Sequence, residues 1–442
     1  MKLKTLILFT LLAAHGIARA ADLLETFRAA QANDPQIAAA YATMQAGEEK
    51  LAQGRSLLMP AVNLSANTTM NDLNVQYVPA TPPFLMGGNY RFNSHGYNVN
   101  MVQPLYRQQN WLAYSESELQ VAAAEAQYKV AEQELVLRAA QAYFDVLNAQ
   151  DGVELAEAQK SAITEQLGQA KRNFEVGSAT ITDTLEAQSR FDLTGAQEIA
   201  AQNNLEIKRR VFQQLTNSMP GNLKRLDAVV KLEAPQPADV EKWIADAQLN
   251  SPQLAVAKAN TQLAEKEVAR NRGGHYPTVD LVANYGNTYA NGSQFGVGND
   301  IRNTNIGVQL NVPLFQGGLI NSKWREAEAN YERAQQDLES AHRNVTLQTS
   351  QAYLGVVSGI VQVQALQQAL ASSTNVLDAT KTGQEVGVRT NLDVLNAQQQ
   401  LYSTRRDLYQ AEYNFLISKL RLKAAAGVLD ADALIEVNQA LH

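Results

Sequence analysis

Two hydrophobic patterns recur along the chain, and each of them occurs in both halves. In the first pattern apolar and polar residues alternate, as Val62 and Leu64 do with Asn63. A period of two places apolar side chains on one face of a β-strand and polar side chains on the other. This pattern predicts strands at residues 61–77, 91–104, 278–290 and 302–313.

The second pattern is an apolar repeat of seven residues, typical of helices that pack as coiled coils. Leu119, Ala126 and Ala140 belong to one such series, and residues 108–173 contain no proline. At ~1.5 Å per residue this helix would be about 100 Å long, far beyond the usual helix of a globular protein. The same reasoning predicts helices at residues 180–216, 319–383 and 389–427.

The alternating segments fit two kinds of sheet. One is a half-buried sheet in a soluble sandwich; the other is a membrane β-barrel, whose strands need ~9–11 residues. Polar, turn-rich loops at 79–89 and 291–299 and aromatic residues near the strand ends favour the barrel. Four strands cannot close a barrel, and open edges are not tolerated in lipid, so a membrane sheet would require oligomerisation.

An internal duplication organises the chain. Asp34-Pro35-Gln36 matches Ser251-Pro252-Gln253 at an offset of 217, and Gln141-Ala142-Tyr143 matches Gln351-Ala352-Tyr353 at an offset of 210. We therefore expect a first repeat at 21–216, a linker at 217–237, a second repeat at 238–427 and a C-terminal segment at 428–442. Four prolines stand at corresponding boundaries between strand and helix: Pro60, Pro104, Pro277 and Pro313.

Composition narrows the function classes. Residues 1–20 have a basic start, an apolar stretch and an Ala-Arg-Ala cleavage site, which predicts an export signal peptide. The formal charge is −7, and removal of Lys2, Lys4 and Arg19 would make it −10. An acidic chain with no basic cluster is a poor nucleic-acid binder. There is no cysteine, the histidines lack metal-ligand spacing and no catalytic motif occurs, so we expect no enzyme, cofactor or metal site.

Each long predicted helix ends at a glycine that is followed by a Thr- and Asp-containing helix start. The first copy reads Glu175-Val176-Gly177-Ser178-Ala179-Thr180-Ile181-Thr182-Asp183. The second reads Glu385-Val386-Gly387-Val388-Arg389-Thr390-Asn391-Leu392-Asp393. With the duplication and the four prolines, these segments resemble the TolC family of outer-membrane channel-tunnels over essentially the whole mature chain.

The resemblance implies a mainly α-helical fold with a membrane β part. Three copies would form a barrel of twelve strands and a hollow periplasmic tunnel of coiled-coil helices. The chain would be an outer-membrane exit duct for type I protein secretion or multidrug efflux, with a large periplasmic portion. A periplasmic adaptor and an inner-membrane pump, either an ABC transporter or a proton-driven one, would supply the energy.

The resemblance also assigns roles to individual residues. The gate would be formed by Arg389 with Thr182 and Asp183, and Asp393 would belong to a constricting ring. The tips that contact the adaptor would be the two Val-Gly turns, at Val176, Gly177, Val386 and Gly387. Two positions depart from the family: its tyrosine before the turn is Gln384 here, and a second ring aspartate is Asn396.

The residues alone leave a second reading open. A structural periplasmic coiled coil with a small soluble sheet would show the same two hydrophobic patterns. Arg389 with Asp183 could then be a plain surface ion pair, worth at most ~1 kcal/mol. Asp393 could be an ordinary helix-start residue.

Overall fold

The structure is a computed structural model that describes residues 21–77, 87–226, 231–439 and 441. The predicted signal peptide and most of the predicted loop 79–89 lie outside this range. The helices and strands follow in the order α1 Leu23–Asn33, α2 Pro35–Ser56, β1 Ala61–Val75, β2 Gly88–Tyr106, α3 Gln108–Glu175, α4 Ile181–Thr216, α5 Val240–Asn250, α6 Pro252–Arg272, η1 Gly273–His275, β3 Thr278–Ala290, β4 Asn299–Asn311, α7 Leu319–Glu385, α8 Asn391–Ala425 and α9 Ala431–Asn438.

The chain divides into two compact units. One, the strand unit, comprises Ala42–Gln127 and Ala255–Ala341; the other, the helical unit, comprises the remaining segments. Each unit contains residues of both sequence repeats. The boundaries between the units fall within four helices, α2, α3, α6 and α7, each of which begins in one unit and ends in the other.

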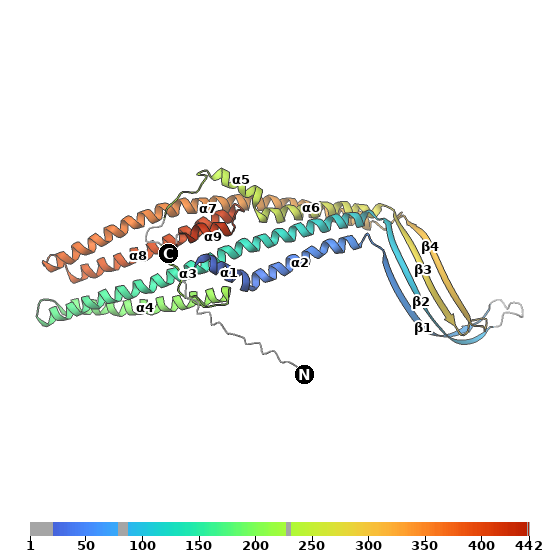
Figure 1. Ribbon diagram of the computed structural model, residues 1–442, viewed down its shortest axis with the longest axis horizontal. Helices are drawn as coiled ribbons and strands as arrows, with labels where there is room; N and C mark the ends of the chain where they lie inside the picture. Colours follow the sequence, from blue (N-terminus) through green and yellow to red (C-terminus); the bar gives the residue numbers. More distant parts are fainter. Residues whose placement is uncertain (1–20, 78–86, 227–230, 440, 442) are drawn as a thin grey trace, which may run out of the picture. The chain divides into compact units, whose positions relative to one another are not determined.

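The strand unit holds a sheet of four antiparallel strands in the order β1-β2-β3-β4 (Figure 1). The expectation of four strands is confirmed; β2 is longer than predicted at both ends, and β4 spans 299–311 rather than 302–313. The register aligns four asparagines in one row across the whole sheet: Asn63, Asn100, Asn284 and Asn305. β1 and β4 are the two open edges.

The helical unit is built from two hairpins, α3 with α4 and α7 with α8 (Figure 1). Their seams are rich in alanine, which lets helices approach closely but buries little apolar area. The main core therefore gathers where larger side chains occur, around Tyr143, Phe144, Leu147, Phe415 and Leu420. Tyr143 also donates a hydrogen bond to the carbonyl oxygen of Lys224 at 2.8 Å, which ties α3 to the segment after α4.

Candidate functional site

The two hairpin turns have the same geometry. Gly177 and Gly387 have φ angles of +75° and +80°, a left-handed conformation that glycine adopts without strain. In each turn the glycine N–H donates to the carbonyl three residues earlier, Phe174 or Gln384, at 3.0 Å. The preceding residues, Val176 and Val386, are exposed at 78% and 69%. The duplicated Val-Gly motif thus presents one apolar side chain at the end of each hairpin.

A capping box follows each turn. The backbone N–H and the hydroxyl of Thr180 both donate to the carboxylate of Asp183, at 2.9 and 2.8 Å. Thr390 and Asp393 repeat this arrangement with the same two distances. The hydrogen bonds from Thr390, backbone first, hold the pKa of Asp393 below its usual range. Both aspartates therefore stabilise helix starts within one chain, whatever they do between chains.

Within the described part of one chain, the ion pairs do not include Arg389 or Asp183. The stem of Arg389 lies against Gly383, where an added Cβ would come within 2.8 Å of its Cγ. Gln384, at the family's tyrosine position, donates to Asn391 Oδ1 at 3.4 Å. Thr182 is exposed at the start of α4. The predicted link of Arg389 to Asp183 stays a prediction about contacts between chains.

Sequence reasoning missed a link between the two hairpins. The guanidinium of Arg190 on α4 donates to Asn396 Oδ1 at 2.9 Å and also to Gln399 Oε1, both on α8. Asn396 is the position at which the family resemblance implies a second ring aspartate. No local sequence signal connects residues about two hundred positions apart, so this contact could be found only in the folded structure.

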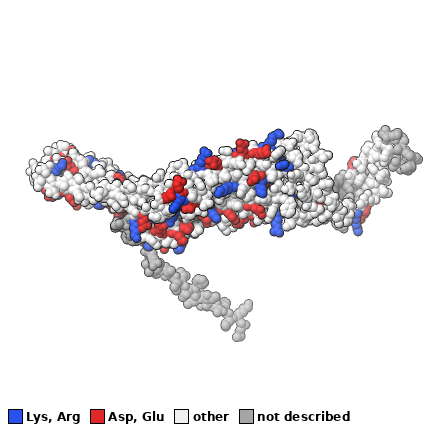
Figure 2. All heavy atoms as spheres, turned by 90° about the horizontal axis from the view of Figure 1, so that it is seen from above, with Lys and Arg blue, Asp and Glu red and all other residues white. Residues whose placement is uncertain are grey.

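The sheet has two unlike faces. Side chains that share a register row lie on the same face. One, the apolar face, carries Val62, Leu64, Met70, Val99, Met101, Leu281, Ala283, Ile306, Val308 and Leu310. The other, the amide face, carries Asn63, Ser65, Asn67, Asn98, Asn100, Asn284, Asn303 and Asn305. The surface over the strands contains few charged atoms (Figure 2).

Three of the four predicted junction prolines lie just outside a strand, and the fourth lies near the end of one. Pro60 and Pro277 directly precede β1 and β3, and Pro313 lies two residues beyond β4. Pro104 is inside β2, at a register shift between Pro104 and Tyr106, which suits a residue that cannot donate to the ladder. Beside this bulge the guanidinium of Arg107 binds both carboxylate oxygens of Asp280, at 2.8 and 2.7 Å.

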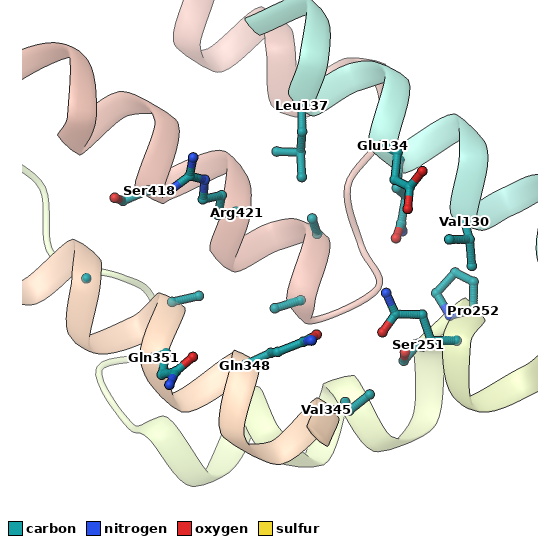
Figure 3. Close-up of a pocket in the computed structure, with 16 residues that line it drawn as sticks. Val130, Glu134, Leu137, Ser251, Pro252, Val345, Gln348, Gln351, Ser418 and Arg421 are labelled. Carbon is teal, nitrogen blue, oxygen red and sulfur yellow. The ribbon is translucent and has the colours of Figure 1, made fainter. Parts of the chain in front are cut away.

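A cavity of about 410 Å³ lies in the helical unit between α3, α7, α8 and the turn that joins α5 to α6 (Figure 3). In the first repeat Asp34 pairs with Arg138. The offsets of 217 and 210 make Ser251 and Gln348 their counterparts, and both line the cavity. Two smaller, uncharged side chains thus stand where the first repeat has the ion pair. In the part of the chain that the structure describes, no group of three or more His, Asp or Glu side chains could hold a metal ion.

A buried acidic group in the helical unit gives stability a pH dependence. Burial raises the pKa of Glu412 on α8 to about 7, against a lowering hydrogen bond from Gln367 and a further raising effect of Asp151. Asp151 itself accepts a hydrogen bond from the Tyr413 hydroxyl at 2.5 Å, and burial raises its pKa as well. Protonation of these carboxyls is therefore favoured in the folded chain.

We expect Glu412→Gln to flatten the pH dependence of thermal unfolding between about pH 5 and pH 7. The unfolded chain releases this proton near pH 4.5, whereas the folded chain holds it to about pH 7. Stability thus falls as pH rises through this window, by on the order of 1–3 kcal/mol per chain. Glu436→Gln is the control, because Lys423 and Lys419 hold its pKa at about 2 and its contribution is lost only in acid. An unchanged slope in Glu412→Gln would contradict the expectation.

Comparison with known proteins identifies the family. The model of the outer membrane efflux protein family matches residues 26–218 and 243–428. The chain is 33% identical to the outer membrane protein TolC of Vibrio cholerae, over 96% of this chain and 94% of that protein. It is 32% identical to the alkaline protease secretion protein AprF of Pseudomonas aeruginosa, over 93% and 85%.

The fold is shared with solved channels. The Campylobacter jejuni outer membrane channel CmeC superposes with a TM-score of 0.80 at 17% identity, over 94% of this chain and 89% of that one. The expected TolC-like architecture of long helices with a four-stranded β part is confirmed. With both repeats matched by one family model and a curated relative aligned along nearly its whole length, this chain belongs to the outer membrane efflux protein family.

Proposed function

We propose that three copies of this chain form an outer-membrane channel that gives exported proteins or small molecules an exit duct. The family is one of outer-membrane channel proteins, not enzymes. Some relatives are named for protein secretion and others for efflux, such as the alkaline protease secretion protein AprF and the outer membrane efflux protein BepC of Brucella suis. We therefore propose that an inner-membrane pump, acting through a periplasmic adaptor, drives secretion, efflux or both.

The observation that carries the proposal is the open four-stranded sheet with one apolar face. β1 and β4 expose unpaired backbone groups, which lipid does not tolerate. Because the strands alternate in direction, β4 of one copy can pair antiparallel with β1 of the next. Closure by three copies gives twelve strands, an even number, as all-antiparallel closure requires.

The apolar face is suited to lipid. Ile306, Val308 and Leu310 are exposed at 76%, 65% and 63% in the single chain, which would be unfavourable in water. Farther along β1 the same face ends at Asp72, whose carboxylate pairs with the directly opposite Arg91 at 2.8 Å. We assign this ion pair to the outer rim of the barrel.

The amide face then lines a water-filled pore. Among the strand residues on that face, Asp280 is the single charged one, and Arg107 pairs with it. Asparagine and serine side chains hydrate well and carry no charge, so the strand region would pass ions of either sign. The acidic residues of the hairpin tips, Asp393 above all, would provide the charged part of the path.

The helices are suited to assembly with other copies. α7 is the one described helix that is long and apolar enough to cross a membrane by length and composition, and 11% of its apolar window is buried. Its exposed Leu347, Leu354 and Val361 recur every seven residues, the spacing of a coiled-coil seam. We propose that neighbouring copies cover this stripe in the tunnel wall.

We further propose that the hairpin tips form the periplasmic gate and the adaptor contact. Asp183 and Thr182 of one copy would receive Arg389 of the next, and three Asp393 carboxylates would surround the axis. The exposed Val176 and Val386 beside Gly177 and Gly387 offer an apolar contact for an adaptor.

The proposal is tested by measuring the oligomeric state of the purified chain and its conductance. The purified mature chain should migrate as a trimer in mild detergent and give discrete conductance steps in a planar bilayer. A monomer that stays soluble without detergent and conducts no current would instead support a structural coiled coil with a soluble sheet. Val308→Pro, which removes a donor from the edge strand, should abolish both trimer and conductance.

A further inference from the structure

The segments that flank the strands are basic, although the chain as a whole is acidic. Four segments connect the strands to the helices, all at the same end of the sheet: residues 51–60, 105–115, 268–277 and 312–325. They contain six cationic side chains, in a chain of formal charge −7: Arg55, Arg107, Arg270, Arg272, Lys323 and Arg325. Acidic residues stand directly at three of their borders, at Glu116, Glu267 and Glu326. This concentration of positive charge requires an explanation.

Internal ion pairs account for two of the six. Arg107 pairs with Asp280 at 2.7 Å and Arg270 with Glu116 at 2.8 Å, and both carboxylates are buried. The other four, here called the juxtamembrane cations, are exposed: Arg55, Arg272, Lys323 and Arg325. None of them is in an ion pair found within the described chain; Arg272 lies 5.7 Å from the ring centre of Trp324.

Helix dipoles account for some of these cations but not for all. Arg55 and Arg272 stand in the last turns of α2 and α6, where a positive charge is favourable. Lys323 and Arg325 are the fifth and seventh residues of α7, beyond its first turn, and Glu326 and Glu328 follow them along the helix. The helix dipole acts within the first turn only, so it does not account for these two cations.

Exposed apolar side chains accompany the cations. Leu314 and Phe315, just beyond β4, are exposed at 93% and 88%, and Trp111 at the start of α3 is exposed at 55%. Leu105, Tyr106 and Leu319 in the same segments are also exposed. Aromatic rings with adjacent cationic side chains are typical of the boundary between a bilayer's hydrocarbon and its headgroups.

We propose that the juxtamembrane cations bind anionic phospholipid headgroups of the periplasmic leaflet of the outer membrane. The proposal rests on the proposed membrane position of the sheet, which places these segments at headgroup depth. The exposed apolar side chains enter the acyl region, and the guanidinium and ammonium groups reach the lipid phosphate. A protein partner would need a surface at the same depth, which the bilayer occupies.

Tryptophan quenching can test this. Of the chain's three tryptophans, Trp111 and Trp324 lie in the basic segments, whereas Trp243 is buried in the helical unit. The trimer would be reconstituted with dibrominated phosphatidylglycerol or dibrominated phosphatidylcholine in unlabelled phosphatidylcholine. We expect phosphatidylglycerol to quench at an at least about threefold lower mole fraction, with the difference shrinking in high salt.

The double variant Lys323→Gln/Arg325→Gln should lose most of this preference, because glutamine keeps the helix and removes the charge. Lys171→Gln/Lys381→Gln, an exposed pair of lysines near the hairpin tips, should keep it. Equal quenching by both lipids, or a preference that the double variant retains, would overturn the proposal. Absence of quenching by either lipid would instead refute the membrane position of the sheet, and with it the proposed channel.

Discussion

Replacing Arg389 by serine is expected to raise the single-channel conductance and the fraction of time the channel is open. In the proposed trimer Arg389 of each copy pairs with Asp183 of its neighbour. An exposed pair is worth at most ~1 kcal/mol, but three equivalent pairs open together, so their loss shifts the closed-to-open ratio by up to roughly a hundredfold. The measurement is conductance in planar bilayers at fixed salt.

The partner residue needs a more careful substitution, because the Asp183 carboxylate also caps α4 through Thr180. Asp183→Asn keeps an oxygen for the cap and removes the charge, whereas Asp183→Ala removes both. If the charge holds the gate, the two variants should open it to a similar degree. Arg406→Ser is the matched control on α8, since Arg406 pairs with the adjacent Asp407. Unchanged conductance in Arg389→Ser and in both Asp183 variants would remove these residues from the gate.

The proposed gate also departs from the pattern that the family resemblance implies, in a way that affects this experiment. Gln384 replaces the tyrosine and contacts Asn391 of its own hairpin, so it adds no link between hairpins. Arg190, by contrast, joins α4 to α8 through Asn396 and Gln399. The two hairpins of one copy are thus held together within the chain, and we expect opening to separate copies rather than hairpins.

Local patterns sufficed for the four strands and their two faces and for the long helices α3, α4, α7 and α8, but the shorter helices α1, α2, α5, α6 and α9 were not individually predicted. The alternation of Val62 and Leu64 with Asn63 predicted a two-faced strand, and a proline-free heptad pattern predicted α3. These signals come from spacing within one segment, and the sheet and helices follow them closely. The Thr180 and Thr390 caps belong to the same class, because a capping box lies within four residues.

Contacts between distant segments could not be predicted in this way. The row of Asn63, Asn100, Asn284 and Asn305 depends on the register of three strand pairs. Loops of several residues do not determine register as a two-residue turn does. The Arg107–Asp280 pair depends on the bulge at Pro104, and Arg190 reaches Asn396 across two hairpins. Each of these required the three-dimensional arrangement.

Two neighbouring substitutions on β4 are expected to have opposite outcomes. Val308 lies on the apolar face in the middle of the exposed run from Ile306 to Leu310, and Gly307 lies on the amide face, where an added Cβ meets nothing within 4 Å. In the proposed trimeric barrel, Val308→Arg would place a cation in hydrocarbon at a cost of ~2–4 kcal/mol per copy, repeated three times. We expect it to abolish detergent-resistant trimers in outer-membrane fractions.

Gly307→Arg introduces the same side chain one residue away and should leave trimer assembly intact. Its guanidinium would enter the pore, where the strand residues of the amide face carry no unpaired charge, and three copies would form a cationic ring. We therefore expect lower conductance and a shift of the reversal potential toward anion selectivity in a salt gradient. If Val308→Arg assembled normally while Gly307→Arg did not, the assignment of the two faces would be reversed. If both assembled without a change in selectivity, the sheet would not line the pore at all.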